Sequence, residues 1–267
     1  MTQARLSVLG VIPARMGSTR FPNKPLVPID GHPMIWHTWK RSQLSGAFDT
    51  LAIATCDEAI RDVAEGFGAH VVMTSDSHTR SGDRVAEAAR HLPGDIILNI
   101  QGDEPLVHPE LIRAVVAQFD GRPDVQCVNP IAPIVDEEDI DSPNTVKVVA
   151  DASGRALYFS RYPIPSNWMH ARTEPVYRQV PILAFRRQFL FDLAALPEMP
   201  LEKQESIDLL RALEHGRPIH VLKTEFQTVG VDVPEDVRRV ERILRDDPVY
   251  RRCAAEGGTA REPSSPW

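Results

Sequence analysis

Cysteine is scarce in this chain: Cys56, Cys127 and Cys253 are the only three in 267 residues. They lie far apart and form no CxxC pair, which argues against a disulfide framework or a cysteine metal site. The nine histidines show neither an HExxH motif nor another paired ligand spacing, so a histidine-bound zinc ion is not indicated. No apolar run approaches the roughly 18 residues that a membrane span needs.

A basic excess is also lacking. The chain has 30 Lys and Arg against 37 Asp and Glu, a net charge of −7. An acidic chain has no general attraction for the phosphates of a nucleic acid. The apolar run 6–13 is too short for a signal peptide and is followed by no small-residue cleavage site. We therefore expect a cytoplasmic protein with neither a nucleic-acid nor a membrane partner.

Short apolar runs alternate with longer amphipathic stretches in the first half of the chain. Continuous apolar runs are typical of strands that are buried on both faces. The pattern predicts strands over 7–12, 51–55, 70–73 and 95–100, and helices near 33–45, 57–66, 83–91 and 109–119. This alternation indicates an α/β fold with a doubly wound, mostly parallel sheet. Ligands bind outside the carboxyl ends of such strands, so we expect the site in the loops 13–25, 74–82 and 101–108.

The second half has a different pattern, richer in hairpin signals and proline. It predicts a hairpin over 144–159, a loop over 163–175, strands over 180–185 and 219–222, and helices over 187–195, 203–214 and 234–244. The last of these helices begins with Pro234, a residue favoured in a first turn. We expect a single domain over residues 1–245 and a flexible C-terminal tail over 246–267.

The loop after the first strand carries Arg15, Ser18, Arg20 and Lys24 and no acidic residue between Ala14 and Pro25. Arginine, lysine and hydroxyl donors are the groups that bind triphosphate oxygens. The spacing is not that of a P-loop, GxxxxGK[ST]. A solvated basic loop is the alternative interpretation.

Two acidic residues follow apolar runs beside a glycine. Asp103 lies in the segment 99–105, Asn-Ile-Gln-Gly-Asp-Glu-Pro, where Gly102 permits a close backbone approach. Asp232 lies in the segment 230–236. Each side chain is a suitable Mg²⁺ ligand, but each is also explained as an N-cap of the helix that follows it, with Glu104 a further candidate for the first cap. No local feature decides between these alternatives.

Together, in this order, the motifs resemble the CMP-sugar-acid synthetase family, and in particular the 3-deoxy-manno-octulosonate (Kdo) cytidylyltransferases. The resemblance runs from about residue 6 to 245, over nearly the whole chain. It is carried by residues 12–26, His78 with 81–84, and segments 99–105, 144–149, 156–161, 201–202 and 230–236. It implies a nucleotidyltransferase, Rossmann-like fold with an inserted β-rich dimerisation subdomain at about 125–190, and hence a homodimer.

The resemblance also implies a function and a set of site residues. The reaction is CMP transfer from CTP to a small anionic acceptor, a Kdo-like sugar acid, with release of pyrophosphate and with Mg²⁺ as cofactor. The implied catalytic residues are Arg15, Lys24 and Asp103, and the implied metal ligands are Asp103 and Asp232. The implied nucleotide contacts are Arg15, Ser18, Arg20, Lys24, His78 and Arg84, and the implied acceptor contacts are Gln101, Lys147, Arg161, Gln179 and Asp208.

Three segments depart from the pattern of the Kdo enzymes. Their His-Ile-Gly-Ile-Tyr is replaced by residues 179–183, Gln-Val-Pro-Ile-Leu, and their Glu-Gln-Leu-Arg by residues 208–211, Asp-Leu-Leu-Arg. Their Ser-Gly-Thr is replaced by residues 80–82, Arg-Ser-Gly. A pocket that loses polar side chains discriminates hydroxyls less well. A modified Kdo, another sugar acid or a small phosphonate is therefore the alternative acceptor.

A non-catalytic nucleotide-binding relative is a second alternative. The intact set of Arg15, Lys24, Asp103 and Asp232 speaks against it. A NAD-type oxidoreductase on a similar sheet is disfavoured because no GxGxxG follows the first strand.

Overall fold

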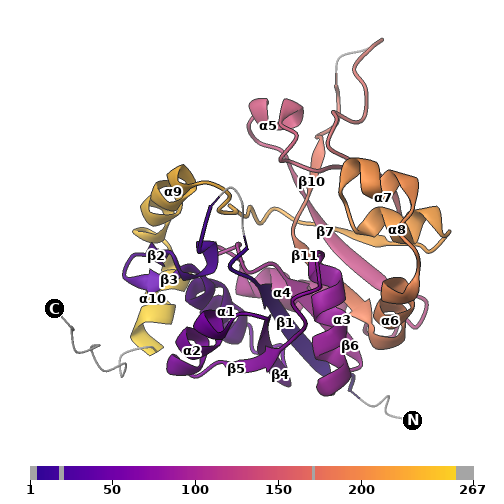
Figure 1. Ribbon diagram of the computed structural model, residues 1–267. Helices are drawn as coiled ribbons and strands as arrows, with labels where there is room; N and C mark the ends of the chain where they lie inside the picture. The colour runs from indigo at the N-terminus through magenta and orange to yellow at the C-terminus, as the bar shows by residue number, and fades with distance from the viewer. Residues whose placement is uncertain (1–4, 18–20, 170–171, 257–267) are drawn as a thin grey trace.

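The computed structural model describes residues 5–17, 21–169 and 172–256. Its centre is one mixed sheet with the strand order β5-β4-β1-β6-β11-β7-β10-β8-β9, and β12 pairs with β7 (Figure 1). The strands of this sheet are β1 (Val8–Ala14), β4 (Thr50–Thr55), β5 (His70–Met73), β6 (Ile96–Ile100), β7 (Cys127–Pro133), β8 (Lys147–Ala150), β9 (Ala156–Ser160), β10 (Tyr177–Gln179), β11 (Ile182–Arg186) and β12 (His220–Lys223). A second, two-stranded sheet contains β2 (Pro28–Ile29) and β3 (His32–Pro33).

The first half of the sheet is parallel, as predicted. β1 lies between β4 and β6, and β5 continues the sheet beyond β4. The side chains of β1 are buried on both faces: Val8 and Ile12 belong to one hydrophobic cluster, and Leu9 and Val11 to the other. The continuous apolar run therefore reflects two buried faces, and the predicted doubly wound α/β fold is confirmed.

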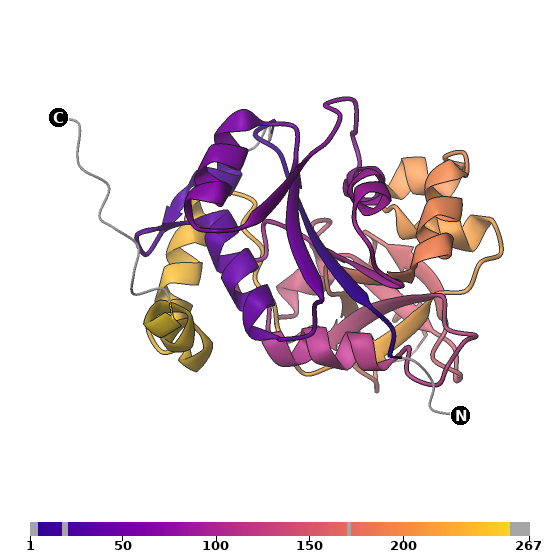
Figure 2. The same cartoon turned by 90° about the horizontal axis from the view of Figure 1, so that it is seen from below.

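Helices cover both faces of the sheet. The helices are η1 (Lys24–Leu26, 3-10), α1 (Met34–Leu44), α2 (Glu58–Gly66), α3 (Ser81–His91), α4 (Pro109–Ala117), α5 (Glu138–Asp141), α6 (Arg187–Ala195), α7 (Pro200–Glu205), α8 (Leu209–Glu214), α9 (Pro234–Leu244) and α10 (Pro248–Glu256). α1, α2, α4 and α10 contribute to one hydrophobic cluster, and α3, α6 and α8 to the other. Seen from below, α10 lies beside α1 on one side of the sheet and the orange helices α6–α8 lie on the other (Figure 2).

The second half of the sheet is mainly antiparallel. β11 pairs antiparallel with both β6 and β7, and the predicted hairpin is present as β8 and β9. β7 was not predicted. It contains Pro130 and Pro133, and proline, which lacks an N–H donor, conceals a central strand from pattern analysis.

The strand predicted over 180–185 is interrupted at Pro181, where β10 has ended and β11 has not begun. Asn129 on β7 spans this interruption. It is fully buried, and its Nδ2 donates to Val180 O at 2.8 Å and to Ile182 O at 3.0 Å. One side chain thus satisfies the two carbonyls on either side of the proline.

Asn129→Ala is expected to lower the free energy of unfolding by about 1–3 kcal/mol, because it removes two buried hydrogen bonds, although Val180 O keeps Ile182 N as a donor at 2.8 Å. Guanidinium denaturation measures the change. Gln188→Ala is the matched control, since it removes an exposed hydrogen bond to Asp192 within α6. An unchanged stability of the Asn129 variant would contradict this role.

The single helix predicted over 203–214 is wrong. The structure has two short helices, α7 and α8, which are separated at Ser206. Ser206 has φ 54° and ψ 49°, a left-handed conformation that ends α7. The helical periodicity continues across the break and therefore hides it.

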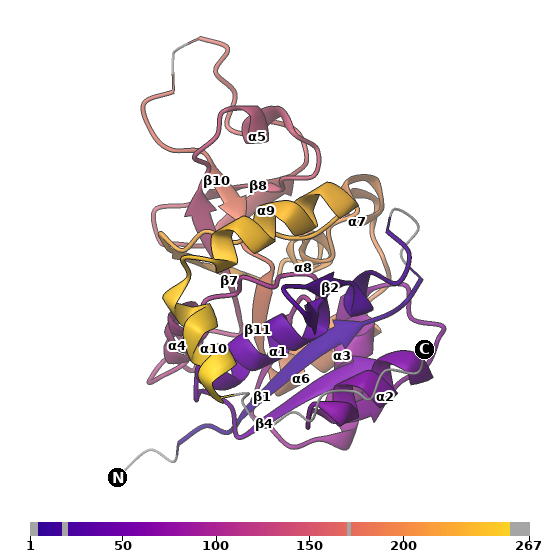
Figure 3. The ribbon, with the colours of Figure 1, turned by 90° about the vertical axis from the view of Figure 1, so that its left-hand side faces the viewer.

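The flexible tail predicted from Asp246 is also wrong for residues 248–256, which form α10. Val249 and Cys253 are buried against the main cluster, and Asp247 pairs with the buried Arg41 of α1. Figure 3 shows α10 in yellow beside α1, with α9 above β2. Val249 and Cys253, one helical turn apart, face the core while most of the other residues of this helix are exposed, and an average over the polar composition of this segment conceals the pair. No helix in the described part of the chain is long and apolar enough to cross a bilayer.

Candidate active site

Three loops meet at the carboxyl edge of the parallel strands. The loops after β1, β5 and β6 surround a hollow of about 360 Å³, a size typical of small-molecule sites. It is lined by Pro13, Ala14, Arg15, Gly17, Lys24, Pro25, Met34, His78, Thr79, Arg80, Ser81, Arg84, Gln101, Gly102 and Asp103. These are the loops in which the site was predicted. The reason is topological: β4 and β6 lie on opposite sides of β1, so the connections diverge at this edge.

Lys24 lies at the centre of an acidic corner of this hollow. Its Nζ is 2.7 Å from Asp103 Oδ2 and 3.4 Å from Asp232 Oδ1, and it donates to Val231 O at 2.8 Å. The Lys24 side chain is 12% exposed, whereas those of Asp103 and Asp232 are 37% and 43% exposed. The two carboxylates that the resemblance implies as metal ligands therefore lie at one corner of the hollow, on either side of Lys24.

The helix-cap alternatives for these acids are wrong. His108 caps α4, because its Nδ1 accepts from Glu110 N at 3.2 Å. Asp236 Oδ2 accepts from Asp232 N at 2.8 Å and from Val233 N at 3.0 Å at the start of α9. The carboxylates of Asp103 and Asp232 are therefore directed to Lys24 while other side chains complete the helices.

Gly102 brings the loop after β6 against the end of β1. A Cβ atom at this position would lie 2.8 Å from Pro13 O, which is closer than a carbon and a carbonyl oxygen can approach. The Gly102 carbonyl in turn accepts from Thr38 Oγ1 of α1 at 3.2 Å. Glycine is thus required for the close approach predicted from the sequence.

Gly102→Ala is expected to move Asp103 away from Lys24 and to lower kcat by about tenfold, which corresponds to about 1.4 kcal/mol of barrier. Steady-state kinetics with saturating CTP measures the change. Gly66→Ala at the exposed end of α2 is the control, because a Cβ there meets nothing within 4 Å. Wild-type kcat in the Gly102 variant would show that the approach of the two loops is not needed for turnover.

Glu104 is a third acid at this corner, and its sequence context predicts no chemical role for it. Burial raises its pKa to about 8, with a further contribution from the Asp103 and Asp232 charges. Its Oε2 has no hydrogen-bond partner in the described ranges. At neutral pH Glu104 is thus largely protonated, and the negative charge facing Lys24 belongs to Asp103 and Asp232.

The corner fits a hard divalent cation. Across residues 5–17, 21–169 and 172–256 no group of three or more His, Cys, Asp or Glu side chains is arranged for metal binding. Mg²⁺ needs no such group, because it is usually held by one or two carboxylates and completes its shell with water and substrate phosphates. Two partly exposed carboxylates that share one cationic partner match this requirement.

The cations of the hollow differ in their surroundings. Arg15 is exposed and has no hydrogen bond or ion pair within the described ranges. Arg84 is 3% exposed, and its Nη2 has no partner there although Nη1 donates to Thr74 Oγ1. His78 pairs with Glu87. Ser18 and Arg20 lie outside the described residues.

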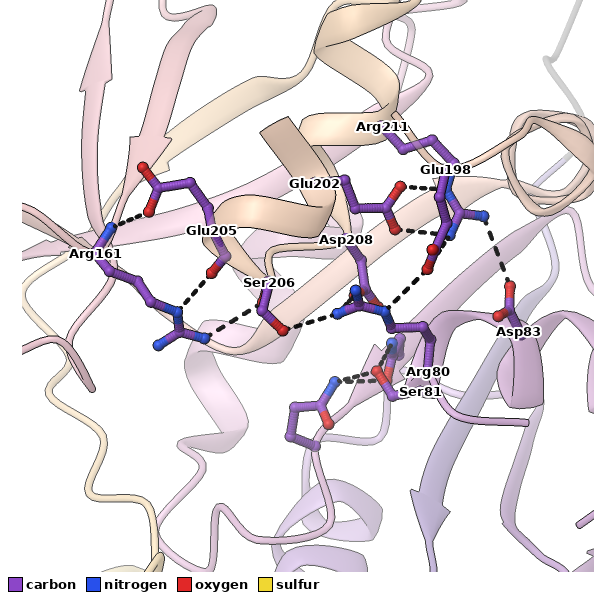
Figure 4. Close-up of polar contacts among 12 residues, drawn as sticks. Arg80, Ser81, Asp83, Arg161, Glu198, Glu202, Glu205, Ser206, Asp208 and Arg211 are labelled. Carbon is purple, nitrogen blue, oxygen red and sulfur yellow. Dashed lines mark hydrogen bonds and ion pairs between the residues drawn. The ribbon is translucent and has the colours of Figure 1, made fainter. Parts of the chain in front are cut away.

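Two side chains that hold the hollow in place were not predicted as site residues. Asp57, after β4, accepts from Met16 N at 2.8 Å and so fixes the start of the basic loop. Ser81 accepts from Gln101 Nε2 at 2.9 Å and from Asn99 Nδ2 at 3.3 Å (Figure 4). Neither residue has a local signal, because each acts on a segment that is distant in the sequence.

The predicted acceptor residues do not all line one hollow. Gln101 lines the hollow, whereas Gln179 is on β10 and Asp208 lines a neighbouring hollow together with Leu183 and Leu209. Arg161 donates to the carbonyls of Pro143, Glu205 and Ser206.

Lys147, which was predicted on the acceptor side, is bound to backbone groups in this structure. Its side chain is fully buried, and its Nζ donates to the carbonyls of Ser142, Thr145 and Arg161. An ammonium group has three N–H donors, so none is left for an acceptor anion. Lys147 instead holds the β8–β9 hairpin together.

Comparison with known proteins agrees with this geometry. Residues 9–222 match the family model for cytidylyltransferases. The chain is 44% identical to a 3-deoxy-manno-octulosonate cytidylyltransferase of Solibacter usitatus, over 89% of this chain and 94% of that protein. It is 41% identical to an 8-amino-3,8-dideoxy-manno-octulosonate cytidylyltransferase of Shewanella sp. strain ANA-3, over 91% of this chain and all of that protein. A solved CMP:2-keto-3-deoxy-manno-octonic acid synthetase complexed with CTP superposes with a TM-score of 0.84 at 33% identity, covering 90% of this chain and 98% of that one.

Proposed function

Since the chain belongs to the cytidylyltransferase family, we propose that it transfers CMP from CTP to a Kdo-like sugar acid and releases pyrophosphate. The observation that carries the proposal is the corner formed by Lys24, Asp103 and Asp232 inside the hollow at the carboxyl ends of β1 and β6. The relatives named for Kdo and amino-Kdo support the class of acceptor.

The cations of the hollow would hold the triphosphate. Arg15 is exposed and unpaired in the described part of the chain, and Arg84 has a buried donor without a partner. Both can donate hydrogen bonds to phosphate oxygens. His78 lines the same hollow. Ser18 and Arg20 are included in the proposed triphosphate contacts because of the sequence resemblance alone. Lys24 would face the phosphate that is transferred.

Members of this family generally use a divalent metal, and we propose Mg²⁺ held by Asp103 and Asp232. When bound, the ion neutralises charge on the phosphate oxygens. Lys24 contributes a fixed positive charge between the same carboxylates. The chain's own residues thus supply positioning and charge, which is the main demand of phosphoryl transfer.

The acceptor hydroxyl would attack the α-phosphorus of CTP. A new oxygen–phosphorus bond forms, the bond to the pyrophosphate oxygen breaks, and the hydroxyl proton is released to solvent. No nucleophile on the protein is required. Gln101, Asp208, Arg161 and Gln179 form the proposed acceptor side, and Gln101 is the member that lines the nucleotide hollow.

A less hydroxylated or modified acid is the second candidate acceptor. It is favoured by Leu183 and Leu209, which line an apolar hollow next to Arg80 and Asp208. A small phosphonate is the simplest case of such an acceptor. The homodimer, built on the β-rich region 125–190, and the cytoplasmic location remain predictions from the sequence.

Pyrophosphate release with CTP tests the proposal directly. Kdo, 8-amino-3,8-dideoxy-manno-octulosonate and small phosphonates are compared as acceptors at a fixed Mg²⁺ concentration. We expect turnover with a Kdo-like acid and with CTP in preference to ATP, GTP or UTP. CTP binding without pyrophosphate release from any acceptor would favour a non-catalytic relative instead.

A further inference from the structure

Arg80 connects two parts of the molecule that are distant in the sequence. It precedes α3, and its guanidinium lies against the junction between α7 and α8 (Figure 4). Nη1 donates to Ser206 Oγ at 3.1 Å and pairs with Asp208 Oδ1 at 3.3 Å, and Nε pairs with Glu198 Oε1 at 3.5 Å. The Arg80 side chain is 20% exposed.

Arg80 also belongs to both hollows. It lines the nucleotide hollow, next to Ser81 and Gln101, and it lines the neighbouring hollow with Asp208. Five of the residues that line the second hollow are Arg80, Gly82, Leu183, Asp208 and Leu209. All five belong to the three segments that depart from the Kdo pattern, so departures that are scattered in the sequence meet at one place in the fold.

The charge of Arg80 matters because acids are in excess here. Arg80 and Arg211 are surrounded by Asp83, Glu198, Glu202 and Asp208. Glu202 is matched by Arg211 through two hydrogen bonds of 2.7 Å. Arg80 is therefore the cation that faces Asp208 directly. Burial, with the charges of Glu202 and Asp83, raises the pKa of Asp208, and Arg80 opposes that effect.

The position of Asp208 is fixed as well. Arg161 donates to Glu205 O at 2.6 Å and to Ser206 O at 3.3 Å, so the left-handed turn at Ser206 is held by one arginine on each side. This turn begins the segment that carries Asp208 into α8. The Asp208 carboxylate thus forms an ion pair with Arg80, which lines both hollows.

We propose that Arg80 is a specificity-determining residue for the acceptor: its charge compensates Asp208 and so disfavours an acid that carries an ammonium group relative to one that carries a hydroxyl. The inference rests on the proposed function, with Asp208 on the acceptor side. An alkyl ammonium is charged at neutral pH, with a reference pKa near that of lysine, about 10.4. It is stabilised beside an uncompensated carboxylate and much less beside a carboxylate already paired with arginine.

The test is the ratio of kcat/KM for 8-amino-3,8-dideoxy-manno-octulosonate to kcat/KM for Kdo, measured by pyrophosphate release with CTP. Arg80→Ser is expected to raise this ratio by about tenfold, because it removes a positive charge within a few ångströms of Asp208. Arg80→Lys keeps the charge and should leave the ratio near that of the unsubstituted enzyme. Asp208→Asn should lower the ratio, and this variant serves also if Arg80→Ser does not fold.

Arg217→Ser is the matched control, because it breaks a comparable pair with Asp192 at 3.0 Å that belongs to neither hollow. A purely structural role for Arg80 would reduce both efficiencies equally and leave the ratio unchanged, which would overturn the proposal. A raised KM for CTP with an unchanged ratio would also overturn it and would place Arg80 on the nucleotide. Failure of the unsubstituted enzyme to use either acid would instead contradict the proposed function, and the assignment of Arg80 with it.

Discussion

Lys24→Ala is expected to lower kcat by about 10²–10³-fold with CTP saturating, because removal of one preorganised charge facing the transferred phosphate typically costs this much. The same substitution leaves Asp103 and Asp232 without the cation that lies between them. Their side chains are 37% and 43% exposed, so water can solvate both carboxylates and the fold should persist. Pyrophosphate release gives the rate, and thermal unfolding shows whether the fold is intact.

Lys203→Ala on the exposed surface of α7 is the control for loss of a lysine. Arg15→Ala is the companion variant: this side chain is exposed and has no partner in the described ranges, so its loss can act only on a ligand. Near-normal kcat in both the Lys24 and the Arg15 variants would remove the basis for placing the triphosphate in this hollow.

The parallel half of the fold is predictable because burial on two faces leaves a continuous apolar run, as in β1 and β6. Topology then places the loops after these strands at one edge. The basic loop and Asp103 are therefore found from sequence alone. β7 and α10 give no such signal, because β7 is interrupted by two prolines and α10 buries only Val249 and Cys253 in the main cluster.

The roles of Asp103 and Asp232 cannot be assigned from the local sequence alone. Asp103 and Asp232 both precede helices, and a carboxylate before a helix is ordinarily explained as a cap. In the structure, His108 and Asp236 accept the backbone N–H groups at the starts of the two helices, so Asp103 and Asp232 are not the caps. Only the folded chain shows that these two residues leave the carboxylates to Lys24.

The acceptor side is less predictable, because its charged groups are satisfied by distant segments. Lys147 carries a positive charge suited to binding an anion, yet its Nζ donates to three backbone carbonyls. The break at Ser206 is stabilised by Arg80 and Arg161, which come from two other parts of the chain. A helical period over 203–214 carries no information about either contact.

Asp103→Asn is the second large effect that we expect. An amide keeps the shape of the carboxylate but removes the charge that a hard divalent ion requires, so kcat should fall by about 10²–10³-fold. The Mg²⁺ concentration for half-maximal activity should rise in parallel. Asp62→Asn, an exposed acid on α2, is the control.

Asp232→Asn should reproduce both changes, because the two carboxylates reach the same Lys24 Nζ. Residues that act as one unit are not additive. The double variant should therefore lose little more than either single variant, whereas two independent sites would multiply their losses. Multiplied losses, or a rate unaffected by a strong chelator, would show that Asp103 and Asp232 do not share one ion, and Lys24 would then pair with them for structural reasons alone.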